Sequence, residues 1–445
     1  MDFQLRRRHY NRCDPGQWLP PDDPRNVDLD APSVSGGRVR GVNWVDKLAR
    51  AIELADRPAF ELFSGLRGSG KSTELERLAG RLSRRDGANL LPVVVRAEEL
   101  LDLTSRVDVP DVWVAILHTA DREVLRAEGA NGDEAMAEGV VRRLWNFVTR
   151  TEIDLPKLDE AITEDVLKTG LALQMRDNPS VRERVRTAVA RHLTRFLAES
   201  SEELLHIEAR ARAVGRAGLV VIFDSLEKLR GTSSSWNEVL QSVEKMFAAD
   251  APYLRLPVHV VYTVPPALLG RTVTPVHFLP MIKVREPDGR EFEPGIEAAR
   301  ALIRSRVPDP ILGELLGPTS CEARARRIIL RSGGYPRDIV RVLRGLFALP
   351  DGAIGERDFE RVLTELGEEY TRLVTADAVE WLARVADEGR FVVASEAHRQ
   401  IADRMLSENI VLRYVNDREW YNVLPAVREM PDVAAALARR RSARP

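Results

Sequence analysis

The chain has 445 residues, of which 44% are hydrophobic and 30% charged, and its formal net charge is -2. This balance is typical of a globular protein with two or three domains, at ~100–200 residues each, and it excludes the overall basic character of many nucleic-acid-binding proteins. Two cysteines, Cys13 and Cys321, are too few for a disulfide framework or a structural zinc site, and no stretch approaches the roughly 20 apolar residues of a membrane span, so we expect a cytoplasmic protein.

Residues 1–40 are rich in proline, aspartate, glycine and arginine, which predicts an irregular leader. Polar residues follow its basic cluster, Arg6-Arg7-Arg8, so the cluster does not open a signal peptide. From 41 to 56 the apolar residues recur at helical spacing, which predicts the first helix.

The apolar run at 59–64 predicts a buried strand, and residues 73–79 have the spacing of a helix. Between them lies Gly65-Leu66-Arg67-Gly68-Ser69-Gly70-Lys71-Ser72, the G-x-x-x-x-G-K-S pattern of a phosphate-binding loop in its strand–loop–helix context. Glycines let the backbone N–H groups of such a loop point at phosphate oxygens, and the helix aims its positive end at the same anion. Lys71 would supply charge for the β/γ-phosphates, and the Ser72 hydroxyl could hold Mg²⁺. We therefore expect ATP or ADP with Mg²⁺ to be bound by Gly65, Gly68, Ser69, Gly70, Lys71, Ser72 and Thr73.

Further apolar runs predict buried strands at 90–95, 219–224 and 259–263. Strands that alternate with helices in this way imply a parallel sheet that is covered on both faces. Residues 109–215 are nearly all helical by pattern, with one helix marked by Val140 to Val148 and a long amphipathic run at 181–205. This is too much helix for one crossover, so we interpret it as an insertion that serves as a scaffold or as a sensor or partner platform.

The predicted strand at 219–224 ends in Asp224, at the carboxyl end where ligands bind in parallel sheets. Asp224 is therefore the candidate that orients Mg²⁺, the alternative being an acidic helix cap. Glu227 is the candidate base or water-positioning residue, the alternative being a surface glutamate at a helix start. Thr263, at the tip of the next strand, could sense the γ-phosphate or be an ordinary strand-end threonine. Catalysis is thus expected from Lys71, Asp224 and Glu227.

The sequence Gly333-Gly334-Tyr335-Pro336-Arg337-Asp338 opens a helix that continues to Leu346. Pro336 suits the first helical turn. Arg337 could reach a bound nucleotide from this position, or it could be a surface arginine.

Beyond about residue 350 the pattern predicts helices at 356–374, 378–386 and 396–406, then strands at 410–415 and 420–423. An Asn416-Asp417 turn would join the two strands into a hairpin. Helices followed by such a wing indicate a winged-helix unit, and we expect the basic tail from 439 onward to fray.

These patterns predict an α/β fold, namely a P-loop NTPase with a parallel sheet and a large helical insertion, followed by a helical lid and a winged-helix domain. The expected divisions are a leader at 1–40, a core at 41–285 with the insertion at about 109–215, a lid at 286–350, a winged helix at 351–432 and a basic tail at 433–445. Other chemistries lack a starting motif, since the seven histidines have no metal-ligand spacing and the sequence contains no G-x-S-x-G.

Together, the loop at 65–72, the run at 220–227, Thr263 and Gly334-Tyr335-Pro336-Arg337 resemble the STAND branch of P-loop ATPases, close relatives of the AAA+ origin-recognition ATPases. The resemblance covers about residues 40–430, without much of the insertion. It implies an ATP-driven switch of bacterial regulation or anti-phage defence, closed with ADP and opened by ATP for assembly or effector activation. It also implies that Gly334 and Pro336 line the adenine side and that Arg337 is a second sensor.

Two positions depart from that family's pattern. Many STAND chains have an arginine shortly after the sensor threonine, where this chain has Val264-Pro265-Pro266. Many also have a winged-helix histidine that holds the ADP phosphate, where this chain has Leu424. Both departures weaken an ADP latch of the family's kind. The sequence also contains no C-terminal repeat array, so the sensor or effector would be a separate protein.

The sequence is compatible with three functions. The first is a regulatory ATPase that acts on a separate protein partner and could form homo-oligomers. The second is a DNA-associated ATPase of the origin-recognition or transposition-helper type, whose candidate recognition helix has a mixed charge pattern: His398, Arg399, Gln400 and Arg404 beside Glu396 and Asp403. The third is a nucleotide-binding structural component with little turnover.

Overall fold

The computed structural model describes the whole chain except residues 18, 21, 32–33, 35–38, 131–165, 167–169, 229–235, 248–251, 351, 417 and 444–445. The described residues divide into two compact bodies. The sheet body consists of Val45–Ser64 and Leu75–His277, and the loop-and-lid body consists of Met1–Trp44, Gly65–Glu74 and Phe278–Pro445. The phosphate-binding loop therefore groups with the C-terminal part of the chain. The domain boundaries expected at 40, 285, 350 and 432 stay predictions.

Within the described residues, one sheet has the strand order β2-β3-β4-β1-β5. Its strands are β1 (Phe60–Gly65), β2 (Leu90–Arg96), β3 (Gly218–Asp224), β4 (His259–Thr263) and β5 (Val276–Leu279). The pairs β2–β3, β3–β4 and β4–β1 are all parallel, and β3 is buried along its whole length. The parallel α/β fold is thus confirmed. The short edge strand β5 was not predicted.

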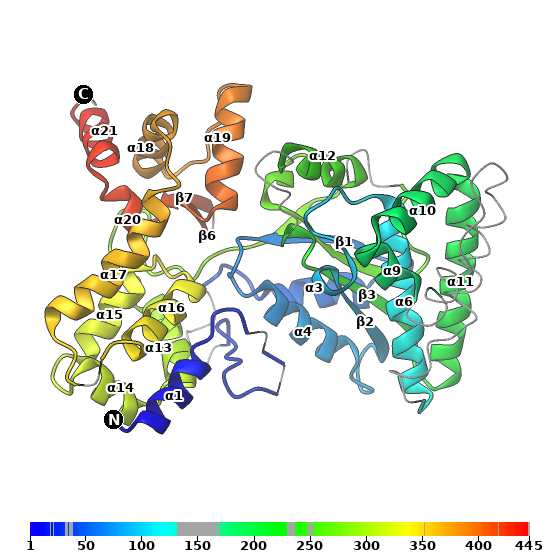
Figure 1. The fold of residues 1–445 in the computed structure, drawn as a ribbon, viewed down its shortest axis with the longest axis horizontal. Coiled ribbons are helices and arrows are strands. Elements are labelled where there is room, and N and C mark those ends of the chain that lie inside the picture. Colours follow the sequence, from blue (N-terminus) through cyan, green and yellow to red (C-terminus); the bar gives the residue numbers. More distant parts are fainter. Residues whose placement is uncertain are drawn as a thin grey trace. The chain divides into compact units, whose positions relative to one another are not determined.

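Helices cover both faces of this sheet (Figure 1). They are α3 (Trp44–Glu53), α4 (Lys71–Leu82), α5 (Ala97–Leu100), α6 (Val109–Ala127), α9 (Leu171–Asp177), α10 (Pro179–Arg191), α11 (Leu193–Ala213) and α12 (Trp236–Phe247), with 3-10 turns η1 (Leu226–Lys228) and η2 (Pro266–Leu268). The connection from β1 to β2 crosses the sheet in the opposite direction to the one from β2 to β3. Right-handed crossovers therefore put α4 on one face, and α6 and α11 on the other.

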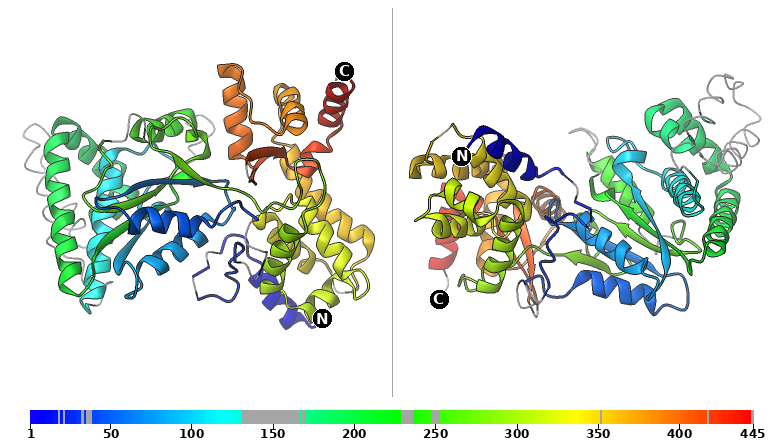
Figure 2. Two further views of the ribbon diagram at one scale, coloured as in Figure 1. Left: turned by 180° about the vertical axis from the view of Figure 1, so that it is seen from behind. Right: turned by 90° about the horizontal axis from the view of Figure 1, so that it is seen from below.

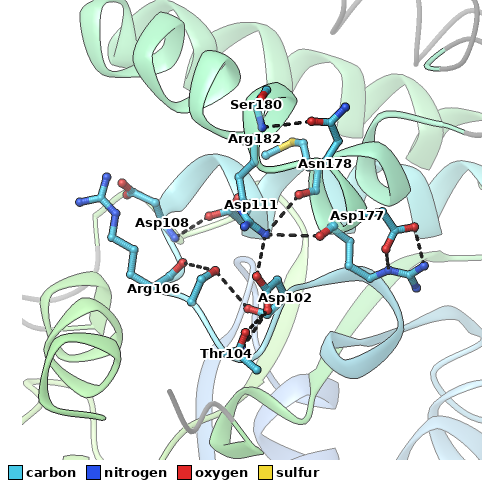
Figure 3. Close-up of polar contacts among 12 residues, drawn as sticks. Asp102, Thr104, Arg106, Asp108, Asp111, Asp177, Asn178, Ser180 and Arg182 are labelled. Atoms are coloured by element: carbon cyan, nitrogen blue, oxygen red, sulfur yellow. Dashed lines mark hydrogen bonds and ion pairs between the residues drawn. The ribbon is translucent and has the colours of Figure 1, made fainter. Parts of the chain in front are cut away.

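Two ion pairs, one of them buried, fasten α10 to the chain that leads from β2 into α6; the pair of Arg182 with Asp102 is drawn in Figure 3. Arg182 lies 3.1 Å from Asp102, and Arg186 donates to Asp111 at 2.7 Å and to the Arg106 carbonyl at 2.8 Å. This part of the insertion is a packed scaffold.

The amphipathic run expected at 181–205 is not one helix. It is broken at His192, whose φ of -134° and ψ of 36° end α10 before α11 begins. The break lets two separate apolar faces, one on α10 and one on α11, reach the same core. The helix predicted around Val140 to Val148 lies outside the described residues.

The loop-and-lid body is mostly helical among its described residues between 293 and 371, and the bounds of 286–350 expected for the lid stay a prediction. Its helices are α1 (Phe3–Arg12), α13 (Glu293–Arg306), α14 (Asp309–Leu316), α15 (Cys321–Arg331), α16 (Pro336–Phe347) and α17 (Glu356–Thr371). The expectation of an irregular leader was wrong for residues 3–12. Asp2 caps α1 by accepting from the Gln4 and Leu5 amides at 2.8 and 3.0 Å, and His9 then stacks on Phe347 of α16.

The rest of this body contains a hairpin module, which we define as α18 (Val379–Glu388), α19 (Glu396–Ser407), β6 (Val411–Val415) and β7 (Glu419–Val423) (Figure 2). The strands pair antiparallel, and Tyr414 stacks on Trp420 with ring centroids 4.5 Å apart. The predicted helices and hairpin are confirmed, although Asp417 of the expected turn lies outside the described residues. The name winged helix stays a prediction.

The prediction of a frayed tail was wrong for residues 439–442. The remaining elements of this body are η3 (Ala376–Ala378), α20 (Pro425–Arg428) and α21 (Pro431–Ser442). The last of these, α21, packs on α18. Ala436 and Leu437 are buried against Ala383. Burial of this apolar face stabilises the helix, although the basic residues of the tail made a helix hard to recognise in the sequence. No helix among the described residues combines the length and the apolar character needed to cross a bilayer.

Candidate functional site

The phosphate-binding loop leaves β1 at Gly65 and enters α4 at Lys71. The Ser69 amide donates to the Leu66 carbonyl at 3.1 Å, which closes a tight turn. Gly68 has φ +81° and Gly70 φ +101°, conformations that side chains with a Cβ rarely adopt. Glycine is therefore required at both positions by the path of the backbone. This curled path is the one that turns successive N–H groups toward a common point.

Lys71 is buried, and its ammonium group folds back onto the start of the loop. Its Nζ donates to the Gly65 carbonyl at 2.9 Å and to the Leu66 carbonyl at 3.1 Å. Ser69 Oγ is also buried, and it has no hydrogen-bond partner among the described residues. Ser72 and Thr73 are half-buried in the first turn of α4, where the helix end is electropositive. The donor set suits an anion such as a phosphate group.

In the sheet body, Asp224 ends β3 and Thr263 ends the neighbouring parallel strand β4. Both side chains are buried at the same edge of the sheet. Ser225 follows with φ +75°, an uncommon conformation for a residue other than glycine and one that is often found at functional sites. This turn leads into η1, which contains Glu227, and the Leu226 amide donates to Thr263 Oγ1 at 3.1 Å. Thr263 thus positions the turn that carries Glu227.

Within the loop-and-lid body, the start of α16 packs against Gly68. A Cβ placed on Gly68 would lie 2.7 Å from Arg337 Nε and 2.8 Å from Tyr335 Oη. Pro336 occupies the first turn of α16, as its sequence position predicted. Gly334 has φ +76°, and a Cβ there would lie 1.9 Å from the Ile282 carbonyl, so close packing alone requires this glycine. The structure therefore brings Arg337 beside the loop.

Two side chains hold the carbonyl oxygen of Arg67 in the middle of the loop. Tyr335 Oη donates to it at 2.5 Å and Asn409 Nδ2 at 3.2 Å, while Asn409 Nδ2 also donates to Tyr335 Oη at 2.9 Å. Tyr335 and Asn409 are both buried, and burial raises the pKa of the Tyr335 hydroxyl. The loop is thus bonded from its outer side by residues of the lid and of the hairpin module.

A buried ion triad fixes the start of α4 from the leader. Arg40 donates to Asp30 Oδ2 at 3.0 Å through Nε and to Glu74 Oε1 at 2.7 Å through Nη2. Arg40 is 1% exposed, so these carboxylates compensate a fully desolvated guanidinium. The triad places the leader against the helix that follows the loop.

The predicted site residues fall in both bodies. Gly65, Gly68, Ser69, Gly70, Lys71, Ser72, Thr73, Pro336 and Arg337 lie together in the loop-and-lid body, and Asp224, Glu227 and Thr263 lie together in the sheet body. Sequence reasoning missed Tyr335, Asn409 and Arg40. Tyr335 stood inside a motif that was singled out, and Asn409 follows a helix as a stop signal, but no local pattern pointed either side chain at Arg67.

Comparisons with known proteins gave only distant structural likeness. No protein-family model matches the chain, and no curated protein matches it. Among solved structures, the Walker-type ATPase PABY2304 of Pyrococcus abyssi is 14% identical, with 88% of this chain and 94% of that chain covered at a TM-score of 0.36. The Aeropyrum pernix ORC1 protein in complex with DNA is 12% identical, with 88% and 92% covered at a TM-score of 0.31. Drosophila ORC bound to DNA is 10% identical, with 96% and 90% covered at a TM-score of 0.35. Since these TM-scores are low, we draw no functional argument from the likeness.

Proposed function

We propose that this chain is an ATP-binding and ATP-hydrolysing regulatory switch that controls the assembly or activation of a separate effector, as in bacterial defence or signalling. The observation that carries the proposal is the grouping of the phosphate-binding loop with the lid and the hairpin module in one compact body. Gly68 of the loop packs directly on Arg337 of the lid. Binding of a ligand in this loop would therefore change the packing of the lid and of the hairpin module, which lie in the same body.

The residues suit a nucleoside triphosphate. The loop would hold the phosphates through the N–H groups of Gly68, Gly70 and Lys71 and through the Lys71 ammonium, which would exchange its bonds to loop carbonyls for bonds to phosphate oxygens. Ser72 and Asp224 would hold the metal, since hydroxyl, carboxylate and water oxygens are the ligands that Mg²⁺ prefers. Bound Mg²⁺ would neutralise charge on the β- and γ-phosphate oxygens.

For hydrolysis, Glu227 would orient the attacking water and accept its proton. Its position depends on the left-handed turn at Ser225 and on the bond from the Leu226 amide to Thr263. Thr263 would therefore sense the γ-phosphate through the same turn that carries the base. Arg337 would act as a second sensor from the lid, and Pro336 and Gly334 would border the base of the nucleotide.

Substitution of Lys71 tests the nucleotide site. Lys71→Ala removes a buried cation, and we expect its affinity for Mg²⁺-ATP and for ADP to fall about 100-fold or more in a calorimetric titration, because charge-assisted hydrogen bonds to phosphate are lost. Lys245→Ala, at an exposed lysine of α12, is the matched control and should bind like the wild type. Equal affinity of the Lys71 variant would refute the site assignment.

The DNA-associated alternative has less support from the surface charges. On α19, Arg399 lies 3.5 Å from Glu396, and Arg404 donates to the Leu373 carbonyl at 3.5 Å. In the basic tail, the three arginines of α21 face acidic residues of α18: Arg439 faces Glu380, Arg440 faces Glu388 and Asp387, and Arg441 faces Asp387. A salt-dependent shift of duplex DNA by the purified chain would favour the alternative. A partner that co-purifies only with ATP would favour the switch.

A further inference from the structure

We propose that Tyr335 and Asn409 are positioning residues of the phosphate-binding loop: they clamp the Arg67 carbonyl so that the Gly68 N–H faces the phosphate, and they make this orientation depend on the hairpin module. The inference rests on the proposed function and assigns a role to two residues that touch no phosphate themselves.

The geometry of one peptide unit carries the first step. In a trans peptide the carbonyl and the following N–H point in opposite directions within one plane. Tyr335 Oη at 2.5 Å and Asn409 Nδ2 at 3.2 Å both hold the oxygen of Arg67. The N–H of Gly68 therefore points away from the clamp. Because residue 68 is a glycine, with φ +81°, no Cβ resists rotation of this peptide, and the bonds from Tyr335 and Asn409 decide its orientation.

Each hydrogen-bond donor of the clamp has an acceptor. Asn409 Nδ2 has two N–H donors, one for the Arg67 carbonyl and one for Tyr335 Oη, and the tyrosine hydroxyl proton then goes to the same carbonyl. Tyr335 and Asn409 are both buried, so a hydrogen bond lost between their side chains is not readily replaced by one to water. The two side chains should act as a unit, and removal of either one should release the peptide.

Asn409 ends α19 in a left-handed backbone conformation, and its side chain bonds to the phosphate-binding loop. Asn409 has φ +59° at the end of α19. Its backbone N–H donates to the Leu406 carbonyl at 3.1 Å, and the backbone N–H of Ile410 donates to the Met405 carbonyl at 2.9 Å. This is the Schellman pattern, in which glycine is the preferred residue at the left-handed position. Asparagine is the next choice there, and here it adds the amide that reaches the loop. A displacement of the junction between α19 and β6 would move that amide away.

The hairpin module has a second bond to the lid that serves as an internal control. Tyr414 Oη of β6 donates to the Gly333 carbonyl at 2.6 Å. This bond is buried, also uses a tyrosine hydroxyl and a glycine-loop carbonyl, and does not involve the phosphate-binding loop. Loss of the Tyr414 hydroxyl should weaken the packing of the module without turning the Arg67–Gly68 peptide.

The experiment compares the full-length wild type with Asn409→Gly, Tyr335→Phe, the double variant and Tyr414→Phe, using Mg²⁺-ADP as the probe. Asn409→Gly keeps the left-handed helix end while it removes the amide, so the variant should fold. We expect each clamp variant to bind ADP about 3- to 10-fold more weakly, the double variant to be no weaker than the weaker single one, and Tyr414→Phe to bind like the wild type.

Hydrogen exchange distinguishes the clamp from a merely structural role of Asn409, because only the clamp makes amide exchange near residue 409 respond to ADP. With ADP, amide exchange at residues 405–415 should slow in the wild type and in Tyr414→Phe but not in Asn409→Gly. Wild-type affinity and an intact exchange response in both clamp variants would overturn the clamp while leaving the nucleotide site in place. Failure of the wild type itself to bind ADP would instead overturn the proposed function, and the clamp with it.

Discussion

In the insertion, the buried guanidinium of Arg186 ends on the carboxylate of Asp111, whereas in the phosphate-binding loop the buried ammonium of Lys71 donates to the carbonyls of Gly65 and Leu66. The first arrangement joins two full and opposite charges at 2.7 Å. The second joins a full charge to neutral dipoles. A polyphosphate could not displace Asp111 from its arginine without leaving a buried carboxylate unpaired, but it would offer Lys71 stronger acceptors than carbonyl oxygens.

The difference separates charged side chains that stabilise the fold from charged side chains that can exchange their hydrogen bonds for bonds to a ligand. Both kinds are buried, so burial alone does not tell them apart. What distinguishes them is the partner and the backbone around it: a capped helix start at Asp111, and glycines at positive φ next to Lys71. If this distinction is right, substitutions in one cluster should change stability and substitutions near the other should change binding or turnover.

The largest expected effect is on turnover. Glu227→Gln should lower the rate of ATP hydrolysis by about 10²–10⁴-fold, because an amide cannot accept the proton of the attacking water. ATP affinity and urea midpoint should stay at the wild-type values. Phosphate release under saturating ATP is the measurement, with Glu238→Gln on the exposed surface of α12 as the control. An unchanged rate would place the base elsewhere.

Next comes stability in the sheet body. Arg186→Ala leaves Asp111 buried without its guanidinium, and we expect the free energy of unfolding to fall by about 3–5 kcal/mol. Arg195→Ala, which breaks an exposed pair with Glu199 on α11, should change it by less than about 1 kcal/mol. Urea denaturation measures both. Weakened ADP binding by the folded Arg186 variant would erase the distinction between the two clusters.

A buried acid in the loop-and-lid body belongs to the structural kind. Burial raises the pKa of Asp338 from 3.8 to about 6, although Tyr370 donates to it at 2.9 Å and Arg341 lies at 3.5 Å. Because the folded chain holds this proton more tightly than the unfolded chain, the stabilisation is complete below pH 4 and is lost as pH rises through 6.

This acid gives a testable pH dependence. Asp338→Asn should lose a pH-dependent contribution on the order of 2–3 kcal/mol between pH 4 and pH 7, which would appear as a flatter plot of unfolding free energy against pH. The amide oxygen still accepts from Tyr370. Identical slopes for the two proteins would show that Asp338 ionises normally.

The smallest expected effect concerns the loop backbone. Gly68→Ala forces a Cβ into a left-handed residue and against Tyr335 Oη and Arg337 Nε, so the loop must shift. We expect ADP affinity to fall about 10-fold and the free energy of unfolding to fall by about 1–2 kcal/mol, which is the cost of a left-handed residue with a Cβ. Gly80→Ala on α4, where a Cβ meets no atom within 4 Å, is the control. Tight binding by the Gly68 variant would mean that the loop tolerates another path.

The parts of this molecule that follow local rules could be predicted from sequence. The strand, glycine loop and helix at 60–82 lie next to one another, and β3 and β4 are apolar runs of the right length. The helix at residues 3–12 was not predicted because prolines and glycines dominate the composition of the leader, whereas the N-cap at Asp2 supports the start of α1. The tail was mispredicted because its three arginines outweighed the apolar residues that α21 buries, which are Val433, Ala436 and Leu437.

The clamp could not be predicted, for a different reason. Tyr335 and Arg67 are 268 residues apart, and Asn409 and Arg67 are 342 apart. A helix-ending asparagine is visible in sequence, but the same signal marks many surface turns. Only the folded structure shows that Asn409 reaches the phosphate-binding loop, 342 residues earlier in the chain.

That separation sets a schedule for synthesis. A ribosome that adds about 5–20 residues per second needs about 20–70 s to travel from Arg67 to Asn409. During that interval the loop already exists on the nascent chain, but Tyr335 is added only 268 residues after Arg67 and Asn409 only at the end. The nascent chain can form β1 and the loop early, yet it acquires a fully oriented phosphate cradle only when nearly all of it has been made.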